Sequence, residues 1–149
     1  MKIAFKLLLI IGLLSCKSNS EERKDEYTIP QEPVAIAQDQ SSESYKRGKE
    51  VYNDFCVTCH LSNGKGVAGN FPPLDGSNWL TNKRTESIHA IKYGLSGPIQ
   101  VNGESYNSVM VPMGLSDQEV ADVMNYIGNS WSNAIKKPVT VEEVTAVKK

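Results

Sequence analysis

The chain has 149 residues, of which 16 are basic and 17 acidic, so its formal net charge is −1. This length suits one domain, or one domain with tails. A hydrophobic share of 40% is ordinary for a soluble globular protein and does not indicate a polytopic membrane protein. The sequence has no run of Lys or Arg that would suit a phosphate backbone, so we do not expect nucleic acid as a partner.

Residues 1–15 have the pattern of a bacterial export signal, with a positive start, an apolar core at 7–14 and the small residue Ser15 at the cleavage position. The apolar run is too short for a permanent membrane span. The segment 13–16 (Leu-Leu-Ser-Cys) resembles the lipobox of bacterial lipoproteins, whose cysteine is acylated and becomes the new N-terminus. We therefore predict lipid attachment at Cys16, which is otherwise an odd thiol in an exported protein. The alternative is a plain secretory signal followed by a coincidental cysteine.

Residues 16–43 are predicted to be a flexible, lipid-anchored linker. The stretch is polar and acidic, is interrupted by Pro30 and Pro33, and has no sustained apolar periodicity. Such a composition buries too little apolar surface to offset the entropy of ordering. We expect a tether that lets the folded domain, residues 44–133, move away from the membrane.

The first helix of the domain is expected over 44–55, capped by Ser42 or Ser44. Tyr45, Gly48 and other residues at helical spacing form an apolar stripe. Glycine inside a helix costs about 1 kcal/mol relative to alanine. Its place on the stripe indicates that another helix crosses very close at Gly48.

The segment 56–60 reads Cys-Val-Thr-Cys-His, the attachment pattern for a c-type haem. At the end of a helix, the sulfurs of Cys56 and Cys59 can each bond to a vinyl group of one porphyrin, and His60 then lies beneath the iron as proximal ligand. A redox dithiol would need a βαβ pattern around it, and a zinc site would need a second ligand pair. The remaining cysteine and histidine, Cys16 and His89, do not provide these. The sequence therefore favours one covalent haem c.

A flexible loop at 62–70, with three glycines and two asparagines, follows the motif and leads into Phe71-Pro72-Pro73-Leu74. A stiff proline carbonyl beside His60 would accept its other ring N–H and fix the tautomer, as ligand histidines usually require. Trp79 is equally well explained as a core residue or as a donor to a haem propionate.

The second half of the chain is predicted to hold a helix at 85–93 stopped by Gly94, and a loop or short hairpin at 97–108. His89, with polar neighbours, is expected to be exposed or structural rather than an iron ligand. The last helix begins at a Ser-x-x-Glu capping box, residues 116–119. It is expected to end at Gly128 or Asn129. Residues 134–149 are charged and contain a proline, so we expect a frayed polar tail.

The sixth iron position has three candidate methionines once the signal is removed: Met110, Met113 and Met124. Met124 lies on the apolar stripe of the last helix and is most simply a core residue. Met110 and Met113 lie in a loop around Pro112, where the backbone can present a thioether to a flat face. A methionine ligand raises the reduction potential and closes the site, which suits electron transfer.

These segments together resemble the class I bacterial cytochromes c over residues 45–133. The resemblance rests on the haem motif, on Phe71-Pro72-Pro73-Leu74, on Tyr106-Asn107-Ser108-Val109-Met110, and on Leu115-Ser116-Asp117 with the helix that follows. It implies an all-α fold, a small helical bundle around one haem in which the N- and C-terminal helices cross. It also implies that the Pro72 carbonyl holds His60 and that Met110 is the sixth ligand. Val111 stands where the family usually has proline, so Met113 remains the alternative.

The resemblance implies a one-electron carrier rather than an enzyme. We expect it to be lipid-anchored to a bacterial membrane on the periplasmic or cell-surface side, and to pass electrons between respiratory components. Its donor would be a quinol-oxidising complex or a dehydrogenase, and its acceptor a terminal oxidase or nitrite reductase. The alternatives are a cytochrome subunit of such a complex, or an open-site haem sensor or peroxidase.

Overall fold

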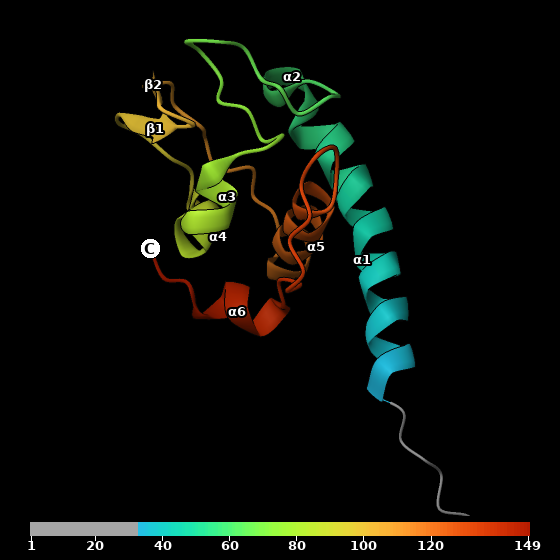
Figure 1. The fold of residues 1–149 in the computed structure, drawn as a ribbon. Coiled ribbons are helices and arrows are strands. Elements are labelled where there is room, and N and C mark those ends of the chain that lie inside the picture. Colours follow the sequence, from blue (N-terminus) through green and yellow to red (C-terminus); the bar gives the residue numbers. More distant parts are fainter. Residues whose placement is uncertain (1–32) are drawn as a thin grey trace, which may run out of the picture. The chain divides into compact units, whose positions relative to one another are not determined.

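The computed structural model describes residues 33–149, with side chains from residue 43 onward. The export signal, Cys16 and most of the proposed linker therefore lie outside the described residues. Figure 1 shows the arrangement of the elements. They are α1 (Pro33–Phe55), α2 (Val57–His60), α3 (Asn78–Asn82), α4 (Arg84–Tyr93), β1 (Ile99–Val101), β2 (Glu104–Tyr106), α5 (Asp117–Gly128) and α6 (Val141–Ala146). The predicted helical bundle is confirmed, with one small antiparallel hairpin added. No helix in this described part is both long enough and apolar enough to cross a bilayer.

Helix α1 begins at Pro33, well before the predicted start at residue 44, so the end of the predicted flexible linker is helical. Proline is favourable in the first turn of a helix because the N–H that it lacks has no acceptor there. The Val-Ala-Ile-Ala sequence that follows is compatible with a helix. The predicted cap at Ser44 is also wrong, because Ser44 lies inside α1 and is buried at 8% exposure.

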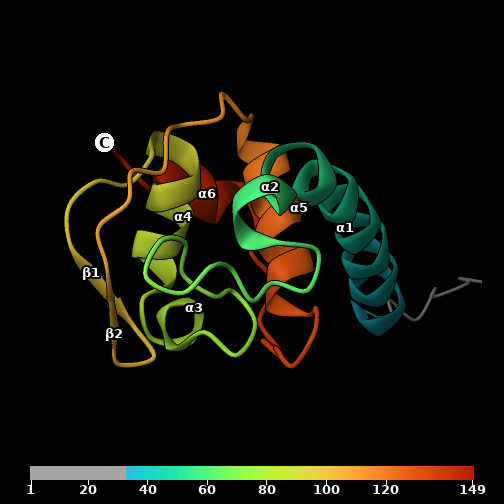
Figure 2. The same ribbon diagram turned by 90° about the horizontal axis from the view of Figure 1, so that it is seen from above.

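The crossing of α1 and α5 is the central packing contact, and both views show the two helices side by side (Figures 1 and 2). A Cβ built on Gly48 would lie 1.9 Å from the carbonyl oxygen of Asp122 and 2.9 Å from Cβ of Tyr126. The predicted close approach at Gly48 is therefore confirmed, and only glycine fits there. The aromatic rings of Tyr45 and Tyr52 pack at a tilt against that of Tyr126 at the crossing, with centroids 5.0 and 5.3 Å from its centroid.

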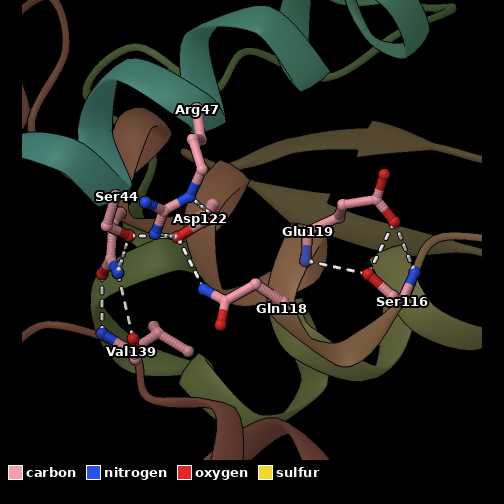
Figure 3. Close-up of polar contacts among 8 residues, drawn as sticks. Ser44, Arg47, Ser116, Gln118, Glu119, Asp122 and Val139 are labelled. Atoms are coloured by element: carbon pink, nitrogen blue, oxygen red, sulfur yellow. Dashed lines mark hydrogen bonds and ion pairs between the residues drawn. The ribbon is translucent and has the colours of Figure 1, made fainter.

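A buried carboxylate joins the same two helices by polar contacts (Figure 3). Asp122 is 1% exposed. Its oxygens accept hydrogen bonds from Ser44 Oγ at 2.5 Å, Arg47 Nε at 2.7 Å and Gln118 Nε2 at 3.0 Å. Buried carboxylates are costly unless they are fully hydrogen-bonded, so this set fixes the register of α1 on α5.

The predicted capping box of the last helix is confirmed. Ser116 Oγ accepts from the Glu119 backbone N–H at 3.3 Å, and the Glu119 carboxylate accepts from the Ser116 backbone N–H at 2.8 Å (Figure 3). The two orphan donors at the start of α5 are thereby satisfied.

The C-terminal segment is packed against the domain, so the prediction of a frayed tail at 134–149 is wrong. Val144 is fully buried, and Val139 and Val147 are 5% and 8% exposed. Arg84 on α4 holds the segment through a two-pronged ion pair with Glu143, at 2.6 and 2.9 Å. Apolar residues spaced along a charged stretch thus provide enough burial to order it.

Candidate haem-binding site

The haem motif follows directly from the last turn of α1. The backbone N–H of Cys56 donates to Tyr52 at 2.9 Å as the final α1 bond. The N–H groups of Cys59 and His60 donate back to the Cys56 carbonyl at 3.2 and 2.9 Å. The chain then leaves the short helix α2 at Leu61, where φ is 62°. Both cysteines and His60 consequently sit on one tight turn beside the cavity.

His60 is oriented by the hydrogen bond that the sequence predicts. Its Nδ1 lies 3.0 Å from the carbonyl oxygen of Pro72, which can only accept, so Nδ1 carries the proton and Nε2 keeps its lone pair. Burial lowers the pKa of His60, and the Pro72 carbonyl opposes that shift. A neutral imidazole is the form that binds iron.

The loop after His60 is held close to the protein by its glycines. A Cβ on Gly66 would lie 2.3 Å from the Phe71 carbonyl oxygen, and one on Gly64 would lie 2.5 Å from the Trp131 ring. Gly64 and Gly66 both have positive φ, of 69° and 61°. Indole Nε1 of Trp131 donates to the Ser62 carbonyl at 3.1 Å and closes the loop from outside. These constraints bring Pro72 to His60.

Beside His60 lies an apolar cavity in two adjoining parts. Sites for cofactors and other small molecules are typically concave and lined mostly by apolar side chains. The two parts share seven residues, drawn from the haem motif, the proline segment, α4, the hairpin and the methionine loop: Cys56, His60, Pro72, Ile91, Leu95, Ile99 and Met110. A large apolar cavity between two cysteines, a histidine and a methionine fits a haem macrocycle with its iron.

Among the candidate methionines, Met110 has the best-defined position. Met110 and Leu95 form an isolated antiparallel bridge, with N–H to carbonyl distances of 2.8 and 2.9 Å. Met110 lines both parts of the cavity, whereas Met113 lines only one. Met124 is 3% exposed in the hydrophobic core, as predicted. The geometry favours Met110, and its role as sixth ligand stays a prediction.

The two thiols are free in the structure. Burial raises the pKa of the Cys56 thiol to about 11, with a smaller contribution from nearby Cys59. Cys56 is therefore a neutral thiol at physiological pH before attachment. Cys56 forms part of the apolar lining of the cavity.

The structure distinguishes His89 from Trp79, because only Trp79 lines the cavity. The His89 ring packs at a tilt against Tyr93, with ring centroids 5.1 Å apart, and is absent from the lining of both cavity parts in the described chain. Trp79 does line the cavity, and Lys83 Nζ lies 4.6 Å from the centroid of its ring. Sequence reasoning did not single out Leu95 or Ile99 as part of the site. Leu95 follows Gly94, where α4 has ended, and its backbone pairs with that of Met110, so its place in the site depends on a distant segment.

Comparison with known proteins agrees with this site. The Cytochrome c family model matches residues 45–131. Cytochrome c-552 of Thermus thermophilus is 42% identical over 106 residues, which is 65% of this chain and 80% of that protein. The cytochrome c subunit of alcohol dehydrogenase (quinone) from Komagataeibacter europaeus is 34% identical over 105 residues, 68% of this chain but 22% of that subunit. The cbb3-type cytochrome c oxidase subunit FixP of Bradyrhizobium diazoefficiens is 30% identical over 86 residues, 54% of this chain and 28% of that subunit.

Proposed function

The chain belongs to the cytochrome c family, and from this premise we propose that it is a membrane-tethered electron carrier of a respiratory chain, with iron held by His60 and Met110. Family membership implies one covalent c-type haem, with Cys56 and Cys59 in the attachment positions. It also makes the protein an electron-transfer protein and not an enzyme. Beyond family membership, we propose three things: that His60 and Met110 bind the iron, that the chain is tethered to a membrane, and that it serves a respiratory chain.

The ligand pair is supported by how the His60 ring and the Met110 backbone are held. When bound, the haem supplies an iron that takes up and gives back one electron. His60 is fixed through Pro72 at 3.0 Å, and Met110 through its paired backbone bonds to Leu95. Held in this way, neither residue would have to move to bind the iron in either charge state. The apolar lining of the cavity excludes water, so little solvent reorganisation accompanies the transfer. The observation that carries the proposal is that Met110 lines the same cavity as His60, whose ring is oriented by the Pro72 carbonyl.

The tether is supported by the sequence before the described residues. The signal pattern at 1–15 ends at Cys16, where acylation would leave the protein on the membrane surface. Replacing Cys16 with alanine should move the cytochrome from the membrane fraction to the soluble fraction of lysed cells. A cytochrome that stays in the membranes would refute lipid attachment at Cys16.

The respiratory setting is supported by the kinds of relative that match. Several are named as cytochrome subunits of dehydrogenases, and one as an oxidase subunit. We propose that the donor is a quinol-oxidising complex or a dehydrogenase, and the acceptor a terminal oxidase or nitrite reductase. A second candidate is a stable cytochrome subunit of such a complex, because in those relatives the matched region is only 22% to 28% of a longer chain.

The ligand pair can be tested by absorbance spectroscopy of the haem-loaded protein. A weak long-wavelength band of the ferric form reports sulfur bound to iron. It should be present in the parent, lost in Met110→Ala and kept in Met113→Ala. The reduced parent should also resist carbon monoxide at neutral pH. If the band is absent from the parent and carbon monoxide binds, the site is open, and a haem sensor or peroxidase takes the place of the carrier.

A further inference from the structure

The part of the chain near its C-terminus that we call the C-terminal strap, residues 137–147, packs across α4 and α5. It lies beyond residue 131, where the match to the family model ends. Figure 1 shows its helix α6 beneath α4 and α5. Val144 on α6 is fully buried in the core, and Val139 exchanges two hydrogen bonds with Asn125 on α5, at 2.7 and 3.0 Å. The strap is therefore an ordered part of this domain that lies outside the matched residues.

The last turn of α4 is attached to the strap. Lys92 Nζ and Tyr93 Oη donate to backbone carbonyls of the strap at 3.0 and 3.1 Å. Helix α4 ends at Tyr93, and two residues later Leu95 forms the backbone bridge with Met110. The segment that pairs with the methionine backbone thus begins directly after two side chains that bind the strap.

The far end of the loop that carries the methionine is attached to the same strap. This methionine loop, residues 107–116, leads into Asp117, the first residue of α5. Asp117 Oδ1 lies 2.8 Å from Lys92 Nζ, and Oδ2 accepts a hydrogen bond from Thr145 Oγ1 at 2.7 Å, the shorter of the two that Thr145 makes. The Lys92 side chain is only 14% exposed, so water screens this ion pair less than one on the open surface.

The methionine loop itself is poorly buried. Val109 and Val111, on either side of Met110, are 66% and 58% exposed. Segments with few buried apolar contacts open more readily than the packed core of a protein. How steadily the loop presents Met110 to the cavity therefore depends on the attachments at its ends.

We propose that the C-terminal strap positions Met110 for the iron by holding the methionine loop at Lys92 and Asp117. This inference rests on the proposed function, because it takes Met110 as the sixth ligand. The strap does not touch the ligand; it acts through the end of α4, the Leu95 bridge and the start of α5. Lys92, Asp117 and Thr145 are positioning residues, and loosening them lets the methionine leave the iron more often.

Displacement of the methionine by imidazole tests this proposal in the haem-loaded chain. At saturating imidazole, the rate at which the long-wavelength sulfur–iron band of the ferric form disappears reports how often the methionine leaves the iron. Thr145→Val removes a hydroxyl and keeps the side-chain shape, and Lys92→Met removes the ammonium and keeps the stem. One hydrogen bond corresponds to a factor of about three to ten in an opening equilibrium. We expect the rate to rise about threefold in Thr145→Val and about tenfold in Lys92→Met, which loses two contacts.

Two control variants separate positioning from general stability. Thr85→Val makes the same chemical change at an exposed site at the opposite end of α4, and it should exchange methionine for imidazole at the parent rate. Gly48→Ala strains the crossing of α1 and α5, so it should lower Tm more than Thr145→Val does but raise the imidazole rate less. If the rates instead follow Tm across all the variants, the strap acts only by stabilising the fold and the proposal is wrong.

Hydrogen exchange of the reduced protein gives a second readout that does not depend on the sulfur–iron band. The backbone N–H groups of Leu95 and Met110 donate across their bridge at 2.8 and 2.9 Å. Relative to the amide of Val123 in the buried middle of α5, they should exchange about threefold faster in Thr145→Val than in the parent.

The two readouts distinguish failure of the inference from failure of the proposed function. A parent without the sulfur–iron band refutes the ligand pair, and the role of the strap in positioning a ligand with it. A parent that has the band, with an imidazole rate and an exchange ratio that neither Thr145→Val nor Lys92→Met changes, refutes the strap alone.

Discussion

Replacing Gly48 with alanine should destabilise the protein even though alanine is the better helix former. The new Cβ would lie 1.9 Å from the Asp122 carbonyl oxygen and 2.5 Å from its carbonyl carbon. Both are backbone atoms, which cannot rotate away as a flexible side chain would. The helices α1 and α5 must therefore separate at their central contact, and the packing of Tyr126 around it must change.

The magnitude follows from two opposing effects. Alanine for glycine inside a helix gains about 1 kcal/mol. Forcing extra atoms into a packed interior typically costs about 1–3 kcal/mol and occasionally more, and contact with backbone places Gly48 at the upper end. We expect a net loss of about 2 kcal/mol or more. For a domain of this size that corresponds to a drop of roughly 8 °C or more in Tm.

Equilibrium urea unfolding and thermal melting of the haem-loaded protein, followed by circular dichroism, measure this loss. Gly128→Ala is the matched control, because it also adds a methyl to a helical glycine. Its Cβ would lie at 3.4 Å from Ile135, close to ordinary contact. That variant should stay within about 1 kcal/mol of the parent. If Gly48→Ala is as stable as Gly128→Ala, the argument from close helix approach is wrong.

Three further predictions concern groups that hold the helices and the C-terminal segment. Arg84 lowers the pKa of Glu143, so this pair stabilises the fold above the ordinary value of 4.5 and its contribution disappears as the pH falls through the lowered value. Glu143→Gln should cost about 1 kcal/mol in urea unfolding at pH 7 and little at pH 2.5; an equal cost at both would contradict the ion pair. Asp122→Ala should cost about 2 kcal/mol, and more than Asp122→Asn, because it leaves buried donors unpaired; the reverse order would count against the network. Val144→Ala should cost about 2 kcal/mol, from lost burial and the space left behind, and a free tail would show no change in Tm.

The haem attachment motif was the most predictable part of the chain, because the residues that define it lie close together in the sequence. Cys56, Cys59 and His60 lie within five residues, and the capping box at Ser116 lies within four. Gly48 could be linked to a close crossing because a helix has a defined face and glycine is costly on it. Each of these signals depends on neighbours along the chain rather than on distant partners.

What the sequence could not predict depends on distant partners. The C-terminal segment looks like a polar tail until Arg84, 59 residues earlier, is placed beside Glu143. Ser44 looks like a helix cap until Asp122 is found against it, 78 residues away. Leu95 enters the site because its backbone pairs with that of Met110, 15 residues later in the chain. The residues next to these positions in the sequence do not reveal such distant contacts. The C-terminal segment and Ser44 were therefore predicted to be exposed tail and helix cap, and Leu95 was not predicted to belong to the site.

The length of helix α1 sets the distance between Pro33 and the haem motif that begins at Cys56. It runs for 23 residues and ends at Phe55, directly before the first attachment cysteine (Figure 1). At a rise of 1.5 Å per residue it measures about 34 Å, comparable to the hydrocarbon thickness of a bilayer. Pro33 therefore lies at the end of α1 that is remote from the haem motif. The described contacts of α1 with α5 begin at Ser44, so removing or adding whole turns before that residue would change the length of helix between Pro33 and the haem motif without altering the site.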